Sequence, residues 1–269
     1  MASFSVITNV AASNAQANLY STNVGLKSAL TRVSSGFRIN YSGDDAAGLA
    51  VANSYRSDTA IMTQGVRNAN DGLSDLQIKD GALDNISKLL DRLATLATQA
   101  ASGQTSSASR TTLNAEFKDV VAEITREATV AGVATNDQGF SVFVSNETGT
   151  NGVVGGQIDS ATSTDLGVNA LTIATDTNAK AAVTAIATAI SNLGAVQGQV
   201  GQLENRLSYA ISLAQSQIVN TKAAESRIRD ANIAEESANL TRFNILNQSG
   251  IAALAQANQS TASVLSLLR

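Results

Sequence analysis

The chain has 269 residues with a formal net charge of −4, and it contains no proline, histidine, cysteine or tryptophan. Without histidine and cysteine it has no thiol nucleophile, no imidazole base and neither of the usual zinc ligands, which argues against an enzyme and against a metal centre. The mild net charge and the lack of a basic run argue against a nucleic-acid surface. Because proline interrupts helices, its absence favours long uninterrupted ones.

The N-terminal segment of residues 1–26 carries no charged side chain. It shows neither a basic stretch nor a continuous apolar stretch, so we expect no ordinary signal peptide. Its apolar residues recur every eleven positions, which gives nearly straight or slightly right-handed helix packing. The packing residues that we expect at this end of the chain are Leu19, Leu26, Leu30, Val33 and Phe37.

Residues 44–130 follow a helical period. One apolar stripe has a/d-like spacing and comprises Met62, Val66, Ala69, Leu73, Leu76, Leu83, Leu90 and Ala97. A second, adjacent stripe comprises Ile86, Leu89, Leu93, Leu96 and Ala100. Because one stripe serves one partner helix, two adjacent stripes predict contact with two helices. The pattern breaks at residues 102–104 and restarts at Leu113, which predicts a turn and a second helix.

Residues 139–176 change to strand-like alternation. Phe140, Val142 and Val144 alternate with more polar positions, turn residues follow, and Leu171 and Ile173 alternate again. This pattern predicts a small β-hairpin region in a loop-rich stretch.

Helical periodicity resumes near Ala179. Two sets of residues repeat every seven positions, which predicts a coiled-coil seam of about five heptads. The first set is Val183, Ile190, Gln197, Glu204, Ile211 and Ile218, and the second is Ile186, Leu193, Val200, Leu207 and Ala214.

The C-terminal segment of residues 243–268 is also free of charge and has an eleven-residue apolar repeat. Unselected tails have no reason to be both periodic and uncharged, and a membrane-surface helix would show lysine and arginine on its polar face. We therefore interpret both ends as polymerisation elements that fold on assembly. The packing residues expected at this end are Leu240, Phe243, Ile251, Leu254, Leu265 and Leu268.

These elements predict a mainly α fold: an elongated antiparallel helical bundle or coiled coil with a small β-hairpin region and paired N- and C-termini. We expect a terminal inner coiled-coil domain from residues 1–43 and 226–269. Residues 44–225 should form a helical bundle domain with the hairpin at about 139–176.

Three blocks of sequence closely resemble the bacterial flagellins. The first is VSSGFRIN at residues 33–40 with GDDAAGLAVA at 43–52, and the second is RNANDGL at 67–73 with GAL at 81–83. The third begins with AAESRIRD at 223–230 and continues through LAQANQ at 254–259 to VLSLL at 264–268. The resemblance covers residues 1–130 and 180–269.

The resemblance implies a structural subunit that self-assembles into the bacterial flagellar filament for motility, outside the cell and exported by the flagellar type III apparatus. It implies paired termini lining the central channel and, because the middle of the chain is short, no outer domains. The implied partners are further copies of the chain, a flagellar export chaperone, and cap and hook-associated proteins. No enzyme activity, cofactor, nucleic acid or membrane is expected. The alternatives are a hook–filament junction protein and a secreted interaction module.

Flagellins are also recognised by a Toll-like innate-immune receptor, and the matching residues here are Arg92, Leu96 and Glu116. Arg92 and Leu96 are four positions apart and share a helix face. Between them the family usually has Arg-Glu where this chain has Ala94 and Thr95, which predicts weaker recognition. The alternative is that Leu96 belongs to the core and Arg92 is a solvated charge.

Overall fold

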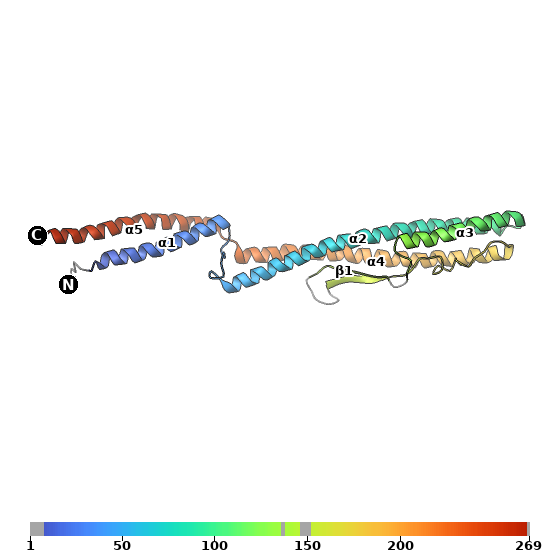
Figure 1. Ribbon diagram of the computed structural model, residues 1–269, viewed down its shortest axis with the longest axis horizontal. Helices are drawn as coiled ribbons and strands as arrows, with labels where there is room; N and C mark the ends of the chain where they lie inside the picture. Colours follow the sequence, from blue (N-terminus) through green and yellow to red (C-terminus); the bar gives the residue numbers. More distant parts are fainter. Residues whose placement is uncertain (1–7, 136–137, 146–151, 268–269) are drawn as a thin grey trace. The chain divides into compact units, whose positions relative to one another are not determined.

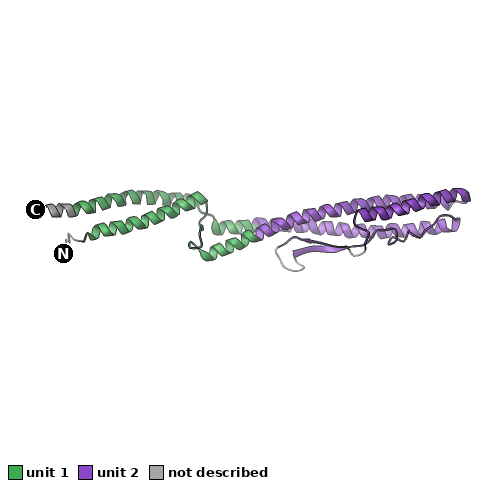
Figure 2. Ribbon diagram, viewed as in Figure 1, with its two compact units in different colours: residues 1–57, 220–269 green, residues 58–219 purple. Residues whose placement is uncertain are grey.

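The computed structural model describes residues 8–135, 138–145 and 152–267, and within them the chain is mainly helical, as predicted. The elements in chain order are α1 (Val10–Ser35), α2 (Ala46–Ala100), α3 (Ser107–Val130), β1 (Gln138–Phe143), β2 (Val153–Ile158), α4 (Asp176–Arg229) and α5 (Ile233–Leu267), shown in Figure 1. They divide into two compact units (Figure 2). Unit 1 contains residues 1–57 and 220–269, and unit 2 contains residues 58–219.

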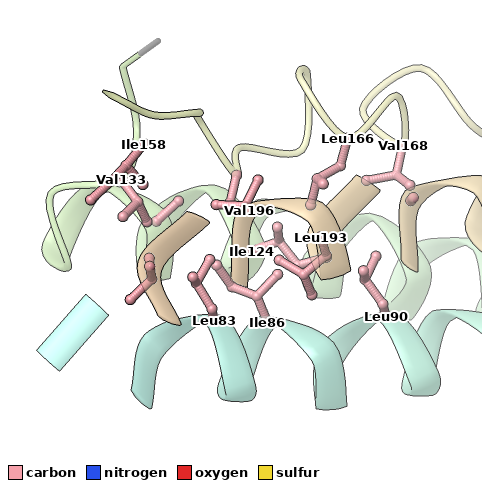
Figure 3. Packing of buried hydrophobic residues seen from close by; sticks show 14 of the residues in the cluster. Leu83, Ile86, Leu90, Ile124, Val133, Ile158, Leu166, Val168, Leu193 and Val196 are labelled. Atoms are coloured by element: carbon pink, nitrogen blue, oxygen red, sulfur yellow. The ribbon is translucent and has the colours of Figure 1, made fainter. Parts of the chain in front are cut away.

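The core of unit 2 is built from α2, α3 and α4. The two apolar stripes predicted on α2 contribute Leu83, Ile86 and Leu90, which face Leu193 and Val196 of α4 in Figure 3. The third helix, α3, adds Phe117, Val121, Ile124 and Ala128 to the same cluster. A helix with two adjacent buried stripes therefore contacts two partner helices, as the sequence indicated.

The turn between α2 and α3 lies where the pattern breaks. Arg110 closes the end of α2, because its Nε donates to the carbonyl of Ala100 at 2.8 Å and its Nη2 donates to the carbonyl of Ser102 at 2.9 Å. Ser106 is the N-cap of α3 and accepts a hydrogen bond from the backbone N–H of Ser109 at 3.1 Å.

The seam of α4 differs from the predicted one. The set Ile186, Leu193, Val200, Leu207 and Ala214 is buried as expected. The stripe beside it is Ala182, Ala189, Val196 and Leu203, one position before each of the first four residues of the predicted set, and Ile190 is exposed. This stripe has valine and leucine at two positions and, at the other two, alanines that are small enough for the helices to approach closely. Because the stripe is shifted by one position, the polar side chains of Gln197 and Glu204 stay out of the buried seam.

The hairpin of β1 and β2 lies on α2 and α4 and is antiparallel, with Phe140 opposite Gly156 and Val142 opposite Val154. It fits closely because glycines face it. A Cβ on Gly65 would lie 2.1 Å from the carbonyl oxygen of Val144, and one on Gly72 would lie 2.7 Å from Cγ2 of Val142. The two glycines are seven residues apart and so share one face of α2.

Strand structure ends at Ile158, earlier than the predicted hairpin region. The alternating pair Leu171 and Ile173 belongs to an irregular segment, in which Ile173 is buried. Polar groups of this segment form hydrogen bonds with a side chain and not with a neighbouring strand. Oδ1 of Asn114 accepts from the backbone N–H of Ile173 at 2.9 Å and from the Thr172 hydroxyl at 2.8 Å.

Candidate assembly interface

Helices α1 and α5 of unit 1 lie side by side and antiparallel, so the predicted pairing of the two ends is present (Figure 1). Two of the expected packing residues meet glycines on the opposite helix. A Cβ on Gly25 would lie 2.6 Å from the ring of Phe243, and one on Gly250 would lie 2.7 Å from Cδ1 of Leu19. Each bulky side chain thus occupies the space left by a missing side chain, which brings the two backbones close together.

Polar side chains fix the register along this pair. The Nδ2 of Asn247 donates to Oδ1 of Asn23 at 2.7 Å, and the Nδ2 of Asn9 donates to the carbonyl of Ala257 at 3.0 Å. Arg32 and Glu236 form an ion pair of 3.2 Å. Because the asparagine side chains carry no net charge, these hydrogen bonds between α1 and α5 add no long-range charge repulsion.

Beyond the end of α1, the chain is tied to the segment between α4 and α5. Gly36 ends α1 with a left-handed φ of 74°, and its carbonyl accepts from the N–H of Ala231 at 2.9 Å. Phe37 forms an isolated antiparallel bridge with Asp230, and its ring centroid lies 4.2 Å from the guanidinium carbon of Arg229. The sequence predicts Phe37 as a packing residue, but it does not indicate its contacts with Arg229 and Asp230, some 190 positions away.

The adjacent acidic residues Asp44 and Asp45 organise the start of α2. Asp45 caps the helix, as its Oδ1 accepts from the N–H of Gly48 at 2.8 Å. Asp44 accepts from the backbone N–H groups of Asn40 and Tyr41 at 3.0 and 3.2 Å. These two hydrogen bonds lower the pKa of Asp44 below its ordinary value. Both carboxylates therefore accept hydrogen bonds from backbone N–H groups.

The remaining expected packing residues are incompletely covered. Leu26, Val33, Leu240 and Leu254 are half-buried, whereas Leu30 and Ile251 expose 56% and 55% of their surface. The side chain of Leu265 and the whole of Leu268 lie outside the described residues. Ala29 is the one fully buried residue that α1 and the described side chains of α5 provide. The helix pair therefore has almost no core of its own.

Several large apolar side chains of this pair are exposed in the single copy. On α1 they are Val10, Tyr20 and Val24, of which Val10 and Val24 fall opposite Leu19 and Leu26 on the helix. On α5 they are Ile245, Leu246 and Ile251.

The three residues matched to receptor recognition are placed differently from one another. Nε of Arg92 on α2 donates to Oε1 of Glu116 on α3 at 3.0 Å, and both side chains are exposed. Leu96 is only 1% exposed and belongs to the core of unit 2. The structure thus presents Arg92 and Glu116 together at the surface and places Leu96 beneath it.

The described residues include no group of three or more histidine, cysteine, aspartate or glutamate side chains that could hold a metal ion. Of the helices in the described part of the chain, α4 alone is long and apolar enough to cross a membrane, and its apolar side chains form the seam with α2.

Comparisons with known proteins agree with this arrangement. The family model for the bacterial flagellin N-terminal helical region matches residues 6–134, and the one for the C-terminal helical region matches residues 183–268. A flagellin of Halalkalibacterium halodurans is 37% identical, and flagellin FlaB1 of Treponema pallidum is 34% identical. Each alignment covers 97% of this chain and 98% of the relative.

A solved structure of a putative flagellar hook-associated protein from Vibrio parahaemolyticus shares the fold, with a TM-score of 0.57 over 70% of this chain and all of that one. At 14% identity it shows the fold alone. The full-length relatives and both family models confirm the predicted function over the junction-protein alternative. The chain belongs to the bacterial flagellin family, whose members are structural and non-enzymatic, and it is a subunit of the flagellar filament.

Proposed function

We propose that α1 and α5 are the elements through which copies of this chain join, and that they gain most of their packing from neighbouring copies. The observation that carries the proposal is the contrast in burial between the helices. Ten residues of α4 are buried, whereas α1 has Ala29 alone. Because ordering a helix costs conformational entropy that burial must offset, a pair with so little core is marginal in a single copy.

The absence of charge supports the same proposal. Each copy has a net charge of −4, so identical charged surfaces repel when many copies are brought together. Residues 1–26 and 243–268 avoid this repulsion because they carry no charge. Their asparagine and glutamine side chains can still form hydrogen bonds between helices, as Asn23 and Asn247 do within one copy. Neighbouring copies can therefore bury these two segments without desolvating ions.

The finer assignments follow from the same residues. We propose residues 1–43 and 226–269 as the inner domain and residues 44–225 as the surrounding bundle, without outer domains. An export chaperone would cover the apolar side chains of α5 before assembly. Cap and hook-associated proteins would meet the same surface at the two ends of the filament, because the first and last copies lack a neighbour on one side.

For recognition by a Toll-like receptor, we propose Arg92 and Glu116 as the contacting residues, with Leu96 supporting the helix from inside. The exposed ion pair of Arg92 with Glu116 supports this assignment. Purified monomer should activate receptor-bearing cells, and the substitution Arg92→Ala should reduce that activation. Lack of activation by the unmodified monomer would contradict the proposal.

The assembly proposal is tested with Val24→Asp, a charge on the side of α1 that faces away from α5. Val24 is exposed in a single copy, so the monomer should keep its far-UV circular dichroism. Seeded polymerisation followed by electron microscopy should show few or no filaments, because assembly would bury an unpaired charge.

Two controls accompany this variant. Val24→Thr keeps the shape of the side chain without the charge and should polymerise. Val130→Asp places the same charge on an exposed valine at the end of α3 and should polymerise as well. Normal filaments from Val24→Asp would refute the role of α1.

A further inference from the structure

One lysine of unit 2 differs from the others in its surroundings. On the helices of this unit, three lysines pair with the aspartate four positions earlier. The pairs are Lys79 with Asp75, Lys88 with Asp84 and Lys180 with Asp176. Lys118 on α3 has Asn114 at that position, and among the described residues its ammonium group has no hydrogen-bond or ion-pair partner. Lys118 is therefore an exposed cation that the chain itself does not neutralise.

Lys118 lines a groove between α3 and the irregular segment that precedes α4. The groove has a volume of about 480 Å³, and its other lining residues are Val121, Ala122, Thr125, Ser163, Asn169 and Leu171. The four residues from α3 are three, four and seven positions apart, so they share one face of the helix over two turns. A volume of this size is in the range of small-molecule binding sites.

The wall of the groove opposite α3 is held in place by hydrogen bonds. The carbonyl of Ser163 accepts from the backbone N–H of Asn169 at 2.9 Å. The hydroxyl oxygens of Ser163 and Thr125 lie 2.6 Å apart, which ties this wall to α3. Asn114 adds a second tie through its hydrogen bonds to residues 172–173. The groove is therefore formed before any ligand arrives, as small-molecule sites usually are.

The lining residues combine three kinds of chemical group. Lys118 offers a positive charge, and Asn169 and Thr125 offer groups that donate and accept hydrogen bonds. Val121 and Leu171 offer apolar contact. The lining has no arginine, whose planar fork suits phosphate, and the net charge of −4 repels a polyanion. A small molecule with a single carboxylate, several hydroxyls and an apolar carbon face matches all three kinds of group.

We propose that this groove binds a sugar acid, that is, a sugar unit with one carboxylate. The carboxylate accepts a hydrogen bond from Nζ of Lys118, and the ring hydroxyls form hydrogen bonds with Asn169 and Thr125. The carbon face of the ring packs over Val121 and Leu171. No residue of α1 or α5 lines the groove, so the inference goes beyond the assembly proposal and does not depend on it.

The test is a titration of the full-length monomer with glucuronate, followed by the backbone amide signals in NMR spectra. We expect saturable chemical-shift changes at Ala122, Thr125 and Asn169. Glucose lacks the carboxylate and hexanoate lacks the hydroxyls, so each should bind at least about tenfold more weakly. The absence of saturable changes with glucuronate would overturn the site. Affinity for glucose or hexanoate equal to that for glucuronate would overturn its assignment to a sugar acid.

Two variants and a matched control test the residues themselves. Lys118→Gln should weaken glucuronate binding at least about tenfold, because it removes the charge that the carboxylate needs. Ala122→Phe places a ring in the groove from an exposed position and should abolish binding while the far-UV circular dichroism stays unchanged. Lys88→Gln removes the same charge from an exposed lysine of α2 and should leave the affinity as it is. Unchanged binding by Lys118→Gln or by Ala122→Phe would contradict the inference.

Discussion

Replacing Gly65 by alanine should destabilise unit 2, although alanine is the better helix former. The new Cβ would lie 2.1 Å from the carbonyl oxygen of Val144, 2.6 Å from its carbonyl carbon and 2.9 Å from its Cα. All three are backbone atoms, so no side-chain rotation relieves the contact and the hairpin must move away from α2. Overpacking of this kind costs about 1–3 kcal/mol.

The gain in helix propensity, about 1 kcal/mol, offsets part of that cost. Displacement of the hairpin also uncovers Val142 and Val144, which are buried against the helices. We therefore expect a net loss of roughly 1–2 kcal/mol in the free energy of unfolding. With an m-value of about 2–3 kcal/mol/M, the urea midpoint should fall by roughly 0.3–1 M.

Gly81→Ala is the matched control, because Gly81 lies in the same helix and a Cβ there would meet nothing within 4 Å. This substitution should stabilise unit 2 by roughly 0.5–1 kcal/mol. The same chemical change thus has opposite signs at two positions of one helix. A stabilising effect of Gly65→Ala as large as that of Gly81→Ala would refute the close approach of the hairpin.

Further predictions concern the core of unit 2, the titration of Glu204 on α4, and the packing of α1 against α5. Leu96→Ala removes a fully buried side chain and should lower the free energy of unfolding by about 2–5 kcal/mol in urea titrations. Burial, followed by the nearby charge of Asp80, raises the pKa of Glu204, so its ionised form destabilises the fold above that pKa. Glu204→Gln should therefore stabilise unit 2 at neutral pH, and the gain should vanish below the ordinary pKa of a glutamate; a gain that persists there would contradict this cause. Gly25→Ala should push the ring of Phe243 off α1, and sedimentation assays should show a higher critical concentration for polymerisation.

The sequence was sufficient to predict the elements whose residues interact locally or repeat. The stripes on α2, the break before α3 and the alternation of Phe140, Val142 and Val144 all depend on positions a few residues apart. The predicted second stripe of α4 is wrong, because a large branched residue such as Ile190 fits the pattern of a buried position better than an alanine does. Ala189 is the buried residue, since the distance between the helices decides which side chain fits.

Contacts between distant parts of the chain could not be predicted from a single sequence. Leu19 and Phe243 lie on facing helices, and each packs against a glycine whose position depends on a register that no local pattern indicates. The bridge between Phe37 and Asp230 is of the same kind. The side chain of Asn114 replaces a strand partner for Ile173, and nothing in the alternating pattern at that point indicates it.

The central claim is that α1 and α5 gain most of their packing from neighbouring copies, and amide hydrogen exchange in monomer and filament tests it most directly. In the monomer, amides of α1 and α5 should exchange far faster than those of α2 and α4, whose buried residues form the core of unit 2. In the filament, the two terminal helices should become protected. Protection of α1 and α5 in the monomer equal to that of α2 would contradict the account, because it would show that the pair is stable without neighbours.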